Sequence, residues 1–65
     1  MEEQIPPVRV GEEMELEVIA IGGKGDGISK VNNFVVFIPS GRKGEKLQCR
    51  ITKVSQKYAF AEIIG

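Results

Sequence analysis

Histidine is absent from the 65-residue chain, and cysteine occurs once, as Cys49. The absence of histidine removes the commonest general base and the commonest metal ligand found in proteins. One cysteine cannot form an internal disulfide, and without histidine a zinc site would have to rely on carboxylates. We therefore expect a protein that is not an enzyme and that holds no metal ion.

Long apolar stretches are also missing, since none approaches the roughly 20 residues that span a bilayer. The first four residues, Met1-Glu2-Glu3-Gln4, are acidic where a secretion signal would be basic. Cys49 alternates with Leu47 and Ile51, a pattern that favours a small buried apolar residue over a reactive thiol. These features predict a cytoplasmic protein with no membrane partner.

The short length allows one domain with a thin core, because a chain of this size buries only about 60% of its surface on folding. Its formal net charge is zero, but the charges are unevenly distributed. Residues 1–17 contain six glutamates and one arginine, whereas residues 18–65 contain eight basic and three acidic residues. An asymmetry of this kind suggests an anionic partner for the basic part.

Five segments have the alternation or the apolar content of short β-strands, and no window shows helical periodicity. The first segment, from Glu13 to about Ile21, alternates glutamates with apolar residues. Turn-forming residues, among them Asn32-Asn33, separate the segments. The chain is therefore predicted to be all-β, a small five-stranded antiparallel barrel, after a flexible tail at residues 1–7. The further strands are expected at 28–31, 34–38, 45–54 and 58–64.

The segment Gly22–Gly27 contains four glycines and invites two nucleotide-binding interpretations. A dinucleotide fingerprint needs a sixth-position glycine, where this chain has Ile28. A P-loop needs Lys and then Ser or Thr after Gly27, where this chain has Ile28-Ser29. Neither motif would be followed by a helix, so we reject both and expect no cofactor. Two interpretations stay open: a strand connection that needs positive φ, or a loop whose amides and Lys24 approach a phosphate.

The aromatic residues are spaced so that they cannot all face the core. Phe34 shares a strand face with Val36 and Ile38, whereas Phe37 lies on the opposite face. At least one of these two phenylalanines should therefore be partly exposed.

The last strand shows the same conflict. Ala59, Ala61 and Ile63 form a plausible interior, which leaves Tyr58 and Phe60 facing outward. Exposed rings beside basic residues suit the binding of unpaired nucleic acid, because bases stack on rings and cations neutralise phosphates. A core position for one or two of the rings, Phe37 above all, stays an alternative. The basic residues in question are Lys30, Arg42, Lys43 and Lys57.

Seven motifs follow one another along the chain: Gly11-Glu12, Glu15–Val18, Lys24–Val31, Phe34–Pro39, Gly44-Glu45, Arg50–Val54 and Tyr58–Glu62. This ordered set resembles the TRAM domain from Val8 to Ile64, and residues 8–65 are accordingly taken as one TRAM-like domain. The resemblance implies an OB-like five-stranded barrel whose nucleic-acid surface includes Lys30, Phe34, Phe37, Tyr58 and Phe60, with Arg42, Lys43 and Lys57 as phosphate partners. Asn33 departs from the family, where glycine is common, and the loop at 39–44 lacks a second proline.

Short free-standing members of this family occur in archaea, and the resemblance to them implies a cold-shock-like RNA chaperone. We expect a monomer that binds single-stranded or unpaired RNA, such as segments of tRNA or rRNA, with low sequence specificity. The alternative is a protein-interaction or RNA-substrate-binding subunit that acts in trans with an RNA-modifying enzyme.

Overall fold

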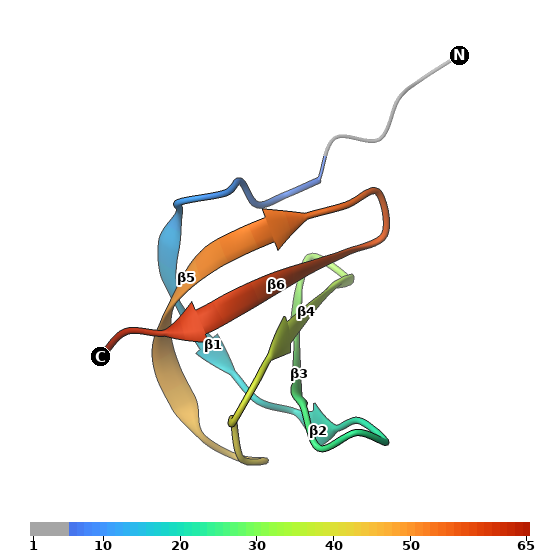
Figure 1. Ribbon diagram of the computed structural model, residues 1–65, viewed down its shortest axis with the longest axis vertical. Coiled ribbons are helices and arrows are strands. Elements are labelled where there is room, and N and C mark those ends of the chain that lie inside the picture. Colours follow the sequence, from blue (N-terminus) through green and yellow to red (C-terminus); the bar gives the residue numbers. More distant parts are fainter. Residues whose placement is uncertain (1–5) are drawn as a thin grey trace.

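The computed structural model describes residues 6–65, which form strands and turns and contain no helix. The strands form one sheet in the order β1-β5-β6-β4-β3-β2 (Figure 1). Since no described segment is helical, none is a long apolar helix of the kind that crosses a membrane. The strands are β1 (Glu13–Glu17), β2 (Ala20–Ile21), β3 (Gly27–Val31), β4 (Phe34–Ile38), β5 (Lys46–Val54) and β6 (Tyr58–Ile63).

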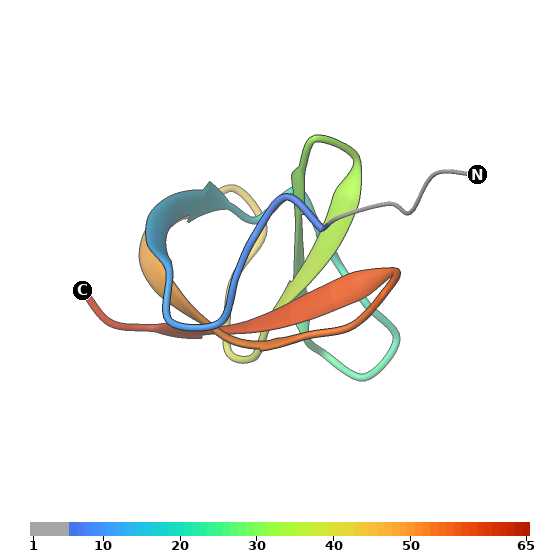
Figure 2. The ribbon, with the colours of Figure 1, turned by 90° about the horizontal axis from the view of Figure 1, so that it is seen from above.

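The two edge strands of this sheet, β1 and β2, are consecutive in the chain and are separated only by Val18 and Ile19. The opposite edges must therefore meet, and the sheet curls into a barrel-like form (Figure 2). Backbone hydrogen bonds continue through the junction: the Val18 amide donates to the Glu45 carbonyl at 2.9 Å, and the Ile19 amide donates to the Ile28 carbonyl at 2.8 Å. The all-β, barrel-like fold predicted from the sequence is confirmed.

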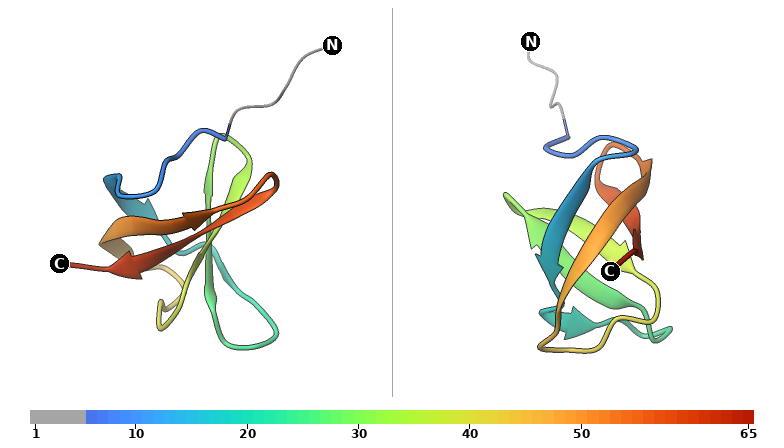
Figure 3. Two further views of the ribbon diagram at one scale, coloured as in Figure 1. Left: turned by 45° about the horizontal axis from the view of Figure 1, so that its top comes forward. Right: turned by 90° about the vertical axis from the view of Figure 1, so that its left-hand side faces the viewer.

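Two details differ from the prediction. The expected first strand is divided into β1 and β2, because the chain passes from one sheet edge to the other at Val18 and Ile19, so there are six strands instead of five. The sheet is also not wholly antiparallel, because β4 and β6 pair in parallel while β1 and β5 run antiparallel side by side (Figure 3). Alternation reports which face a residue occupies, but it does not report the direction of the neighbouring strand.

The predicted turn at Asn32-Asn33 is confirmed. Both residues have positive φ, 51° and 69°, and they connect β3 to β4 so that Val31 lies opposite Phe34. This is the conformation of the tight hairpin turns that asparagine and glycine favour. In the glycine-rich loop before β3, Gly25 has a φ of 89°, so the expected need for positive φ is confirmed there too.

The core consists of nine buried residues. Cys49 is among them with no exposed surface, as predicted, and its burial raises the pKa of the thiol. Of the predicted N-terminal tail, residues 1–5 lie outside the described residues, and within the rest Pro6 is half-buried and Pro7 exposed. The core residues are Val8, Leu16, Val18, Val36, Ile38, Cys49, Ile51, Ala59 and Ala61.

Candidate nucleic-acid interface

The outer face of β4 and β6 carries most of the aromatic residues. Phe37 of β4 lies opposite Phe60 of β6, and Val35 lies opposite Tyr58. Paired residues point to the same face of a sheet, and the residues between them, such as Ala59, are buried. The prediction that Tyr58 and Phe60 face outward is thus confirmed, and Phe37 is the outward-facing member of the two phenylalanines in β4.

Phe37, Tyr58 and Phe60 contact one another and are called the aromatic cluster from here on. Phe37 and Phe60 have ring centroids 5.5 Å apart with planes tilted by 32°. Tyr58 meets both edge-on, at 5.9 Å and 72° to Phe37 and at 5.5 Å and 88° to Phe60. Such pairs contribute about 0.5–1.5 kcal/mol each beyond area burial. Tyr58 is 37% exposed and the other two rings are half-buried, so the cluster is one continuous aromatic surface.

Phe34, which the family resemblance assigned to the nucleic-acid surface, lies on the other side of the sheet. It shares a face with Val36 and Ile38, both without exposed surface, and it packs half-buried against the core. The alternation along β4 makes this placement unavoidable once Phe37 faces outward. Phe34 therefore lies apart from the aromatic cluster.

Lys53 is a neighbour of the cluster that the sequence reasoning missed. Its ammonium nitrogen lies 5.8 Å from the centroid of the Phe60 ring, within the range of a cation–π interaction. Strict alternation would turn Lys53 inward with Ile51, but β5 has a register irregularity between these two residues. The extra residue, Thr52, turns Lys53 toward the Phe60 side.

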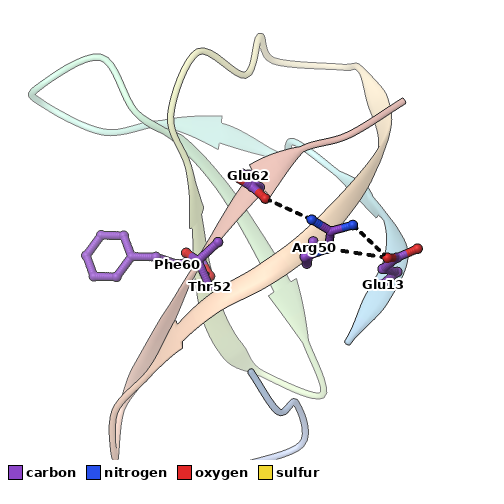
Figure 4. Close-up of polar contacts among 5 residues, drawn as sticks. All are labelled: Glu13, Arg50, Thr52, Phe60 and Glu62. Atoms are coloured by element: carbon purple, nitrogen blue, oxygen red, sulfur yellow. Dashed lines mark hydrogen bonds and ion pairs between the residues drawn. The ribbon is translucent and has the colours of Figure 1, made fainter. Parts of the chain in front are cut away.

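Thr52 also ties the irregularity to β6. Its hydroxyl donates a hydrogen bond to the Phe60 carbonyl at 3.3 Å (Figure 4). The sequence does contain a signal for this arrangement, since a lysine at a core-facing position is costly to bury and indicates a local break in alternation.

The predicted cations fall into two groups. Lys30 lies opposite Val35, in the row that continues to Tyr58, and Lys57 directly precedes Tyr58. Both are exposed and lie beside the cluster. The other three, also exposed, lie in the loops that adjoin the far end of β4, where Ile38 pairs with Gly27. They are Lys24, Arg42 and Lys43.

Arg50 occupies the middle of β5 and is held by two carboxylates. Its Nη2 and Nε lie 3.0 and 3.3 Å from Oε2 of Glu13, and its Nη1 lies 3.4 Å from Oε2 of Glu62 (Figure 4). The hydrogen bond to Glu13, followed by the negative charges of both glutamates, raises the pKa of Arg50. All three side chains are about half exposed, so these ion pairs contribute little to stability.

No group of three or more acidic or cysteine side chains within residues 6–65 is arranged to hold a metal ion.

The family model of the TRAM domain matches residues 7–64, nearly the whole chain. The chain belongs to the TRAM domain family. The TRAM domain is a nucleic-acid-binding domain found in RNA methyltransferases and translation factors.

Two relatives of this TRAM protein are small. The solution structure of a conserved protein of Methanococcus maripaludis superimposes on this chain with a TM-score of 0.88. The two are 39% identical, over 94% of this chain and 87% of that one. An uncharacterized protein of Methanocaldococcus jannaschii is 47% identical over 58 residues, which are 89% of this chain and 75% of that protein.

Other relatives are larger. The beta subunit of translation initiation factor 2 of Methanothrix thermoacetophila is 42% identical over 88% of this chain. A ribosomal RNA large subunit methyltransferase E of Haloarcula marismortui is 48% identical over 86% of this chain. The TRAM protein described here spans only 27% and 21% of the lengths of these two relatives.

Proposed function

We propose that this TRAM protein binds single-stranded or locally unpaired RNA through the aromatic cluster and acts as an RNA chaperone. The observation that carries the proposal is the cluster itself, three touching rings on the outer face of the barrel. A base stacked on a ring is worth about 1–3 kcal/mol whatever its identity. Duplex bases have no free faces, so stacking selects single strands, loops and bulges.

The orientation of the rings supports a short site with little sequence preference. The planes of Phe37 and Phe60 are tilted by 32° to each other, whereas Tyr58 stands nearly perpendicular to Phe60 and at 72° to Phe37. A base that stacks on either phenylalanine therefore meets Tyr58 at a steep angle, so the three rings do not offer parallel stacking surfaces. Such a site reads the presence of unpaired bases and not their order.

The cations beside the cluster supply the attraction for phosphates. Lys30, Lys53 and Lys57 adjoin the rings, and the loop residues Lys24, Arg42 and Lys43 extend the positive charge past the end of β4. If three to five phosphates are neutralised, the slope of log K against log salt concentration is about −2 to −3.5 for single strands.

Chaperone activity follows from mass action. A protein that binds the unpaired state of an RNA shifts the equilibrium away from the paired state by its differential affinity, without ATP and without a catalytic group. The proposed substrates are unpaired segments of RNAs such as tRNA and rRNA. We propose that the protein acts in the cytoplasm as a monomer, and not as an enzyme.

A second candidate is a subunit that presents RNA to a separate enzyme. It is favoured by the occurrence of the same domain as a small part of larger relatives such as the rRNA methyltransferase. The exposed glutamates of β1, Glu13, Glu15 and Glu17, would then form the docking face. Copurification separates the two: a stoichiometric protein partner with weak RNA affinity supports the subunit, whereas bound RNA supports the chaperone.

The decisive test compares two equally exposed residues of β6, Tyr58 at 37% and Ile63 at 38%. Binding of a fluorescent eight-nucleotide oligouridylate is measured by anisotropy. We expect Tyr58→Ala to weaken binding by about tenfold, the equivalent of one lost stacking contact, and Ile63→Ala to leave it unchanged. A thermal melt of each variant shows that the barrel is intact. Equal affinities for the wild type and the Tyr58→Ala variant would refute the proposed site.

A further inference from the structure

The residue pairs that link β1, β5 and β6 form a charged row beside the aromatic cluster. Glu13 lies opposite Arg50, and Arg50 lies opposite Glu62, so the three side chains follow one another across three strands. Glu62 is two residues after Phe60 on β6 and thus points to the same face as the cluster. We call Glu13, Arg50 and Glu62 the charged row.

The charged row carries two carboxylates and one guanidinium, and its side chains are 45–53% exposed. Beyond it on β1, Glu15 lies opposite Gln48 and Glu17 opposite Lys46. The outer face therefore changes sign: it is basic around the rings and acidic from the charged row to the edge strand.

The fork of Arg50 that would grip a phosphate is already occupied. Nη2 and Nε share one oxygen of Glu13, and Nη1 reaches Glu62. A phosphate that approached Arg50 would have to displace one carboxylate while standing next to the other. Arg50 is therefore a cation on the binding face that is poorly available to RNA.

We propose that the charged row is the border of the RNA-binding surface and that Glu13 and Glu62 act as positioning residues. By neutralising Arg50 and repelling phosphates, they keep the RNA backbone on the side of Lys30, Lys53 and Lys57. This inference rests on the proposed function and adds the limit of the binding site. The charged row confines the bound RNA to the surface of β3, β4, β6 and the adjoining end of β5.

The test measures how oligouridylate binding depends on salt concentration, because the slope of log K against log salt concentration is proportional to the number of neutralised phosphates. The double substitution Glu13→Gln and Glu62→Gln releases Arg50, and we expect tighter binding with a slope more negative by about 0.7, the value of one additional phosphate contact. The matched control, Glu15→Gln with Glu17→Gln, makes the same change in net charge on the same face without touching Arg50. It is expected to tighten binding through the general field alone, with the slope unchanged.

The substitution Arg50→Gln completes the design. In the wild-type background it should leave the salt slope unchanged. In the background of the Glu13 and Glu62 substitutions it should return the slope to the wild-type value, because the additional phosphate contact worth about 0.7 is lost. Equal salt slopes for the two double variants would overturn the proposal that the charged row is the border. A slope less negative by about 0.7 when Arg50 alone is replaced would overturn it too. If the unaltered protein binds no oligouridylate, the proposed function fails first and this inference falls with it.

Discussion

The ammonium nitrogen of Lys53 lies 5.8 Å from the centroid of the Phe60 ring, because an irregularity in β5 turns Lys53 toward the outer face. We predict that Lys53→Gln weakens binding of oligouridylate severalfold and makes the salt slope less negative by about 0.7, since one phosphate contact is lost. Lys46→Gln on the same strand, opposite Glu17, is the control with the same change in net charge, and it should weaken binding only slightly, through the general field, and leave the slope unchanged. A salt titration followed by anisotropy measures both, and identical slopes for wild type and Lys53→Gln would contradict the prediction.

Phe34 and Phe37 are three residues apart on β4 and point to opposite faces of the sheet, Phe34 toward the core and Phe37 toward Tyr58 and Phe60. Complete burial makes a Phe→Ala change cost about 3–5 kcal/mol, so for the half-buried Phe34 we predict a loss of about 2 kcal/mol in the free energy of unfolding. Well below its melting temperature, the Phe34→Ala variant should bind RNA with unchanged affinity. Urea denaturation and anisotropy provide the two measurements. A stable variant that had lost RNA binding would show that Phe34 belongs to the interface after all.

The features that sequence predicts well here are those that depend on alternation within one strand. Buried Ala59 and Ala61 and outward Tyr58 and Phe60 follow from the period of two. The same period also placed Ile63 in the interior, but Ile63 is the last residue of β6 and is 38% exposed, because alternation does not show where a strand leaves the barrel.

The features that sequence did not predict depend on relations between strands. The parallel pairing of β4 with β6 brings Phe37 next to Phe60, and no pattern within either strand indicates it. The register irregularity before Lys53 is of the same kind. The role given to Phe34 came from family resemblance and not from its own strand, whose pattern places it with Val36 and Ile38.

Burial of Cys49 makes its thiol a probe of folding at alkaline pH. Burial raises the thiol pKa in the folded state, whereas the unfolded thiol has a pKa of about 8.5. Between these two values the unfolded chain loses the proton and the folded one keeps it, so the free energy of unfolding falls as pH rises, by at most about 1.4 kcal/mol per pH unit. Below about pH 8.5 this contribution is fully present.

We therefore predict that the stability of wild type relative to Cys49→Ala is constant from pH 6 to 8 and declines above about pH 8.5. Urea denaturation of both proteins across this range measures the difference, and the comparison with the Ala variant removes every pH effect that does not come from the thiol of Cys49. Parallel stability curves up to pH 10 would show that the folded thiol titrates like the unfolded one.

Gly27 and Gly41 allow the loop after β4 to pass directly against β3. A Cβ on Gly27 would stand 3.0 Å from the Ile38 carbonyl oxygen and 3.2 Å from the Cα of Gly41, and a Cβ on Gly41 would stand 3.0 Å from Cγ2 of Val18. Backbone atoms cannot yield as a flexible side chain does, so Gly27→Ala should cost about 1–3 kcal/mol through overpacking.

Gly23 is the matched control, since an added Cβ there meets nothing within 4 Å and its φ is not positive. Gly23→Ala should be neutral or stabilise by up to about 1 kcal/mol, because alanine has fewer conformations than glycine in the unfolded chain. Guanidinium midpoints of the two variants test the contrast. Equal midpoints would mean that β3 and the loop after β4 separate easily, and that the loop cations Arg42 and Lys43 are not held in place by this packing.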